Sequence, residues 1–202
     1  MNTKPLVVIA ALALLAGCSS NGGQEDEPSG EPTVEEAAPP EVVAGTPIAF
    51  ELEAPEGFVL ADGEDRPDPL AANQVSQVFN LDGASPGNQI LVTSYSLDAA
   101  LAAPGFDGVL PVVMEYDVAR GFEADPVQYR HAIVHRMGGV HRYLEIDLGG
   151  TPAKEYNHYF GQDTHLVQIT CRWTDDFDAV MAGCESLEAG FPAPEGWQAG
   201  AA

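Results

Sequence analysis

The amino-acid sequence predicts an α+β domain, in which an antiparallel β-sheet packs with helices, preceded by a disordered acidic tether. Most of the chain after residue 45 consists of short runs in which apolar residues alternate with period two, as in half-buried strands. Only two segments have helical spacing. Residues 19–45 contain seven acidic side chains, no basic one and no aromatic one, so they cannot bury a core. We therefore expect a globular domain over 46–192 and a flexible tail over 193–202.

Strands are expected to dominate the domain. Seven segments have strand-like composition and patterning, at 48–53, 75–81, 89–97, 132–137, 141–148, 153–160 and 165–173. Turn and loop residues separate them, including a turn at 55–58 and an acidic, proline-rich loop at 61–73. The last strand would place four side chains on one face, those of Val167, Ile169, Cys171 and Trp173.

Two helices are expected. The first covers about 110–121, after an Ala/Gly/Pro-rich stretch, with Pro111 suited to its first turn. The second is the clearest element of the chain, because six apolar residues recur at helical spacing, namely Phe177, Val180, Met181, Cys184, Leu187 and Phe191. Acidic residues at 175–176 favour its start, and Gly190 favours its end.

The N-terminus predicts the location of the protein. Lys4 precedes an apolar run over 6–16, which is too short to span a bilayer but typical of a signal peptide. The stretch Leu15-Ala16-Gly17-Cys18 presents a cysteine after small residues, as bacterial lipoprotein signals do. We expect removal of residues 1–17, acylation of Cys18 and a lipidated linker over 18–45. The domain would then face outside the cytoplasm on the cell membrane; the alternative is an ordinary secretory signal with a chance cysteine.

The chain is strongly acidic. It carries 31 Asp and Glu against 8 Lys and Arg, a formal net charge of -23. From residue 46 onward the balance is 24 acidic against 7 basic, or -17. Such a surface repels nucleic acid and anionic lipid headgroups, which excludes both as direct ligands. Solubility or salt adaptation explains this charge better than a cation-binding role does.

The cysteines predict a disulfide. If Cys18 carries lipid, Cys171 and Cys184 remain as a pair in an exported protein, where disulfides persist. Their expected elements, the last strand and the last helix, are consecutive and should pack together. Two buried free thiols are the alternative. A redox-active pair is disfavoured because the chain has no C-x-x-C motif.

Three short motifs resemble the PsbP-like superfamily, as found in actinobacterial lipoproteins of the LpqN/LpqT type. The segment 50–58 is similar to the family's opening motif, and 149–153 to its turn before a hairpin. Residues 166–170, followed by Phe177 and a helix closing at 190–191, resemble its last strand and helix. The resemblance covers most of 46–192. It implies an αβα sandwich with a binding or scaffolding role rather than a shared catalytic site.

We predict no metal and no cofactor. The five histidines are at positions 131, 135, 141, 158 and 165. His131 and His135 lie on an expected strand, where four residues separate the rings by about 13 Å, too far to share one ion. The loop 62–68 offers four carboxylates, but its spacing does not match a calcium loop and Arg66 lies within it. We interpret it as a solvated loop.

Aromatic residues of the later strands suggest a ligand groove. Tyr143, Tyr156, Tyr159 and Trp173 are the candidates. A sheet core is the alternative role for most of them.

Together these features predict a lipid-anchored bacterial cell-envelope protein whose domain binds a ligand or partner without catalysis. An apolar or lipid ligand, or another envelope protein, is the expected partner. The chain contains no G-x-S-x-G, P-loop or H-E-x-x-H motif. The alternatives are an envelope hydrolase that uses unrecognised acidic residues, and a purely structural envelope protein.

Overall fold

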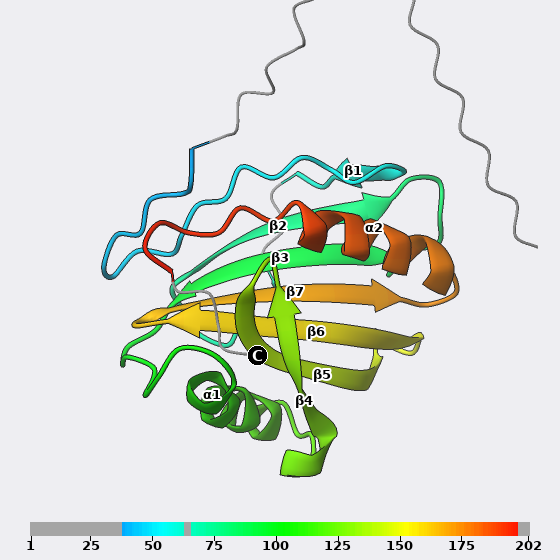
Figure 1. The fold of residues 1–202 in the computed structure, drawn as a ribbon. Coiled ribbons are helices and arrows are strands. Elements are labelled where there is room, and N and C mark those ends of the chain that lie inside the picture. The colour runs from blue at the N-terminus through cyan, green and yellow to red at the C-terminus, as the bar shows by residue number, and fades with distance from the viewer. Residues whose placement is uncertain (1–37, 63–65, 198–202) are drawn as a thin grey trace, which may run out of the picture. The chain divides into compact units, whose positions relative to one another are not determined.

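A computed structural model describes residues 38–62 and 66–197. The elements, in chain order, are β1 (Phe58–Leu60), β2 (Gln74–Leu81), β3 (Gln89–Ser96), α1 (Phe106–Ala119), a 3-10 turn (Pro126–Gln128), β4 (Tyr129–Val134), β5 (Met137–Asp147), β6 (Pro152–Gln162), β7 (His165–Trp173) and α2 (Phe177–Ala189). The strands form one antiparallel sheet in the order β1-β2-β3-β7-β6-β5-β4 (Figure 1). The α+β class is therefore confirmed.

Strand β7 lies at the centre of this sheet, and all nine of its residues are buried. Because successive side chains of a strand point to opposite faces, β7 contributes to two separate cores. Val167, Ile169, Cys171 and Trp173 belong to the core that includes α2, whereas Leu166 belongs to the core that includes α1. Each helix thus covers a different face of the sheet.

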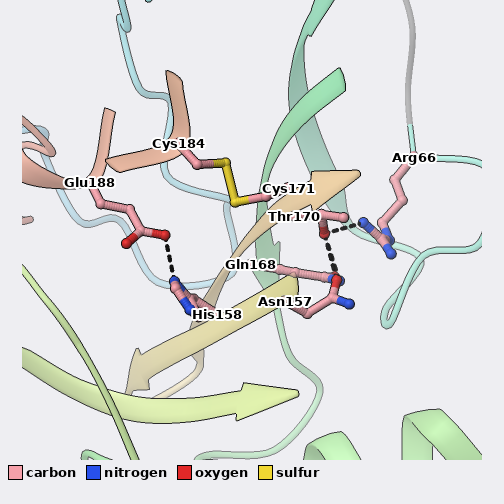
Figure 2. Close-up of a disulfide and its surroundings, with 8 residues drawn as sticks. All are labelled: Arg66, Asn157, His158, Gln168, Thr170, Cys171, Cys184 and Glu188. Atoms are coloured by element: carbon pink, nitrogen blue, oxygen red, sulfur yellow. Dashed lines mark hydrogen bonds and ion pairs between the residues drawn. A yellow bond between two sulfur atoms is a disulfide. The ribbon is translucent and has the colours of Figure 1, made fainter. Parts of the chain in front are cut away.

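Helix α2 contacts β7 and β3, and its stripe of Val180, Cys184 and Leu187 is buried (Figure 1). Phe177, at its first position, is 42% exposed and so lies at the margin of this core. Gly183 permits a close approach, since an added Cβ would lie 2.4 Å from the Phe58 ring. The Sγ atoms of Cys171 and Cys184 lie 2.07 Å apart, a bonded distance that joins β7 to α2 (Figure 2).

Helix α1 differs from the prediction. It begins at Phe106 rather than near residue 110, because Gly105 has a left-handed backbone (φ 81°) that allows the chain to turn into the helix. Pro111 is therefore inside the helix and not in its first turn. The Pro111 side chain is exposed, so it lies away from the buried face of the helix, which contains Val109 and Val113.

Two strand predictions are wrong. Residues 48–53 form no strand, although Ile48 and Phe50 are buried in the core, because the Ile48 N–H donates to the Ser94 hydroxyl instead of a neighbouring strand. The predicted turn at 55–58 is present, closed by a hydrogen bond from the Phe58 N–H to the Pro55 oxygen, and the short edge strand β1 begins at its last residue. The predicted strand 132–137 is interrupted by a two-residue hairpin turn, at His135 and Arg136, which both have positive φ values.

The ordered domain extends beyond the predicted limits at both ends. In the expected linker, the backbone oxygen of Val43 contacts the His165 ring at 3.1 Å, and Pro40 accepts a hydrogen bond from the Glu195 N–H. In the expected tail, the Trp197 ring lies 6.2 Å from the Phe160 ring. Residues 38–45 and 193–197 therefore pack against the domain.

The predicted signal peptide 1–17, Cys18 and most of the predicted tether lie outside the described residues. Across 38–62 and 66–197, the structure has no helix that is both long enough and apolar enough to span a bilayer.

Reduction of the disulfide is expected to weaken the domain without unfolding it. The bond closes a loop with a sequence separation of 13, and a loop of about this length is worth about 3 kcal/mol. The melting temperature should therefore fall by roughly 6–12 °C, measured calorimetrically with and without reductant. A Cys171→Ala/Cys184→Ala variant should not respond to reductant. Alkylation of both thiols in denatured, unreduced protein would show that the bond is absent.

Candidate aromatic groove

An open hollow of about 600 Å³ lies on the α2 side of the sheet, next to the first residue of α2. We call it the aromatic groove. It is lined by Gln128, Arg130, His141, Tyr143, Lys154, Tyr156, Trp173 and Phe177. Three of the four predicted groove residues, Tyr143, Tyr156 and Trp173, are among them. The other five lining residues were not expected in a groove from the sequence, namely Gln128, Arg130, His141, Lys154 and Phe177.

The register of the sheet positions these side chains. Tyr143 of β5 is paired with Tyr156 of β6. His141 lies two residues before Tyr143 in β5 and is paired with Arg130 of β4. Lys154 lies two residues before Tyr156 in β6 and is paired with Trp173 of β7. Because β5 and β6 are antiparallel, these two pairs lie on opposite sides of the tyrosine pair. Because side chains two residues apart share a face, the tyrosine pair lies between a row containing Arg130 and a row containing Lys154.

The aromatic rings are in mutual contact. The ring centroids of Tyr143 and Tyr156 are 5.4 Å apart, and those of Tyr156 and Trp173 are 5.1 Å apart, both pairs tilted. Phe177 extends the cluster, with its ring 5.0 Å from Trp173. Trp173 is only 7% exposed, so it forms the floor of the groove, while the half-buried tyrosines remain accessible. The cluster presents an apolar surface with two hydroxyl groups.

The fourth predicted groove residue, Tyr159, is not part of the groove. It is fully buried on the opposite face, in the core that includes α1, where its hydroxyl lies 3.1 Å from the Gln168 amide. Tyr156 and Tyr159 are three residues apart in one strand, so alternation places them on opposite faces. Period-2 alternation alone could have separated them.

The groove has a positive rim. Lys154 and Arg130 are exposed, and neither forms an ion pair with a carboxylate of the described ranges. Among the described residues, Arg130 donates to the backbone oxygens of Val127 and Tyr129. None of the lining residues is acidic. A neighbouring hollow of about 460 Å³ shares Lys154 and Trp173 with the groove and includes Glu145 and Asp147.

His141 is a neutral member of the groove at neutral pH. Burial lowers its pKa to about 4, and the nearby His158 and Arg130 act in the same direction. The rings of His141 and His158 are 4.9 Å apart on neighbouring strands. His158 in turn bonds to the Glu188 carboxylate of α2 (Figure 2). The permanent cations of the groove are therefore Arg130 and Lys154.

A cluster of polar side chains, separate from the aromatic groove, is buried beneath α1 with Arg66 at its centre. The prediction that 62–68 is a solvated loop is wrong at this residue, which is 2% exposed. Its guanidinium donates to the Thr170 hydroxyl at 2.8 Å and to the Tyr116 hydroxyl at 3.1 Å. Gln168 lies beside it and accepts at 3.0 Å from Arg66 when its amide is oriented to satisfy both atoms. Figure 2 shows Arg66 and the disulfide on opposite sides of β7.

Glu155 provides the buried negative charge of this region. It has no exposed surface, and its carboxylate lies 2.6 Å from Arg172 and 3.6 Å from Arg120. Burial alone would raise the pKa of Glu155, but the charges of Arg66, Arg172 and Arg120 outweigh it and hold this pKa below its usual value. Glu155 therefore stays ionised, which makes it a structural anion.

The histidines are distributed over several sites. His131 stacks on Phe106 at 4.0 Å, His135 lies in the hairpin turn, and the His165 ring contacts the backbone oxygens of Val43 and Thr46. No set of three potential metal ligands (His, Cys, Asp or Glu) converges among the residues that the structure describes.

Comparisons with known proteins do not assign a family. No protein-family model matches the chain, and no curated protein matches it. A crystal structure from Bacteroides thetaiotaomicron VPI-5482, determined at 1.50 Å resolution, aligns with a TM-score of 0.40 and 9% identity. The alignment covers 67% of this chain and 40% of that protein. A likeness this distant assigns neither a fold family nor a function.

Removal of the buried carboxylate should be strongly destabilising. Glu155→Gln leaves Arg172 without its buried counter-charge and Arg120 with Asp68 alone, and loss of a buried ion-pair partner typically costs about 3–5 kcal/mol. Glu115→Gln removes an exposed carboxylate from α1 and should change the free energy of unfolding by less than about 0.5 kcal/mol. Urea denaturation of both variants measures the difference. Equal stabilities for the two would contradict the structural role of Glu155.

His141 should make the domain less stable in mild acid. Its pKa is about 4 in the folded state against 6.5 ordinarily, so between these values the unfolded chain binds more protons. The free energy of unfolding should therefore fall as the pH drops from 6.5 to 4. His141→Gln should flatten this part of the profile, measured by urea denaturation at several pH values. Identical slopes for variant and wild type would show that His141 titrates normally.

Proposed function

We propose that this chain is a lipid-anchored protein of the bacterial cell envelope, whose domain binds a ligand in the aromatic groove without catalysis. The observation that carries the proposal is the accessible cluster of Tyr143, Tyr156, Trp173 and Phe177 in one hollow. The anchor rests on the Cys18 motif. An antiparallel sheet with a helix against each face supports the PsbP-like assignment, and with it the αβα sandwich.

Glu155 and Asp175 are not suited to act as general acids. A general acid that works near neutral pH needs a raised pKa. The pKa values of Glu155 and Asp175 are both lowered. Hydrogen bonds from Asn88, Ser85 and Thr174 lower that of Asp175, and the arginines lower that of Glu155.

A larger hollow of about 670 Å³, between residues 68–73 and α1, is a weaker candidate for the ligand site. Its basic side chain, Arg120, is already paired with Asp68 at 2.6 Å. Tyr116 is the one aromatic residue in its lining, and its hydroxyl already hydrogen-bonds to the Asp68 backbone oxygen. The aromatic groove, by contrast, offers several rings together with charged groups that have no carboxylate partner.

The test uses a neutral fluorescent apolar probe, N-phenyl-1-naphthylamine, titrated into the full-length chain. Wild type should bind it saturably. Tyr143→Ala should raise the dissociation constant about tenfold, because a ring contributes on the order of 1.5 kcal/mol of apolar contact. Tyr143 is half-buried, so the melting temperature of the variant is measured alongside.

Val118→Ser serves as the matched control. It removes an apolar side chain that is 62% exposed on α1 and does not line the groove. Its dissociation constant should equal that of wild type. Equal weakening by both variants, or no effect of Tyr143→Ala in a folded variant, would show that the groove is not the binding site.

A further inference from the structure

We infer that the aromatic groove selects a small organic monoanion, with a planar apolar body on the tyrosine pair and a carboxylate on Lys154. This inference rests on the proposed function and adds the charge of the ligand.

The distribution of positive charge carries the argument. Seven Arg and Lys side chains follow residue 45. Four of them, Arg66, Arg120, Arg142 and Arg172, are committed to ion pairs beneath α1. Three have no carboxylate partner within the described ranges, namely Arg130, Arg136 and Lys154. Two of these three line the same hollow.

The lining is also free of negative charge. Of the acidic residues that the structure describes, none lines the aromatic groove. A potential competitor is Glu145, which is paired with Lys154 across β5 and β6. Its carboxylate accepts from the Tyr143 hydroxyl at 3.0 Å and makes no ion pair with Lys154. The ammonium group therefore remains available to a ligand.

The geometry suits a flat body with one charged end. The rows of Arg130 and Lys154 are separated by the tyrosine row, so their backbones are about 13 Å apart along the strands. A carboxylate at one end of the tyrosine pair therefore lies closest to one of the two cations. Lys154 is the better partner because Arg130 already donates to the backbone oxygens of Val127 and Tyr129.

The net charge of the domain favours a small anion over a large one. Charges more than about 8 Å away are largely screened at physiological salt, so a small ligand in the groove experiences mainly the local cations. A polyanion or an anionic membrane would extend over the acidic surface and be repelled.

The experiment compares 2-naphthoate with 2-naphthamide, a neutral ligand of the same shape, by calorimetric titration into the full-length chain. Wild type should bind naphthoate about five- to tenfold more tightly, as expected for one charge-assisted contact. Lys154→Gln should abolish this preference, and Lys154→Arg should retain it. Arg136→Gln removes the same charge from the hairpin turn and should leave the preference unchanged.

The outcomes separate the two claims. Equal affinity of wild type for both compounds, or an unchanged preference in folded Lys154→Gln, would overturn the charge inference while the groove remained a binding site. If Arg136→Gln also lost the preference for naphthoate, the preference would be an effect of the overall charge of the protein, and this result would also overturn the inference. If wild type bound neither compound, the proposed function itself would fail.

Discussion

The buried carboxylate of Glu155 is neutralised by arginines from the sheet, from the end of α1 and from a loop. Strand alternation directs this carboxylate to the face beneath α1, where it has no contact with water. Arg172 from β7 and Arg120, at the end of α1, both lie within 4 Å of it. Arg66 adds its charge from a loop. Since a buried charge is tolerated only when paired, this carboxylate requires basic groups of the sheet, the helix and the loop to lie close to it.

The same interactions determine which surface can attract an anion. Because the chain has few basic residues, each arginine that is paired in the interior leaves one fewer positive charge available on the surface. The α1 side of the sheet contains four of them, and they are all paired. The α2 side retains Lys154 and Arg130 beside an aromatic floor. The charge distribution is therefore asymmetric between the two faces, although the surface as a whole is acidic.

Local patterns were enough to predict much of this fold. Strong alternation located β7, helical spacing located α2, and these two elements brought Cys171 and Cys184 together. The burial of Arg66 could not be predicted, because its partners come from strands and a helix distant in the chain. The hairpin turn at 135–136 lacks the glycine or asparagine that usually marks positive φ values. The cations of the groove depend on strand register, which the sequence does not specify locally.

The most direct test of the groove is an NMR titration that follows the two indole N–H signals of the protein. Trp173 forms the floor of the groove, whereas Trp197 contacts Phe160 and does not line the groove. Addition of 2-naphthoate should shift the Trp173 signal progressively and leave the Trp197 signal in place. A shift confined to Trp197, or no shift of either signal at saturating ligand, would contradict the account.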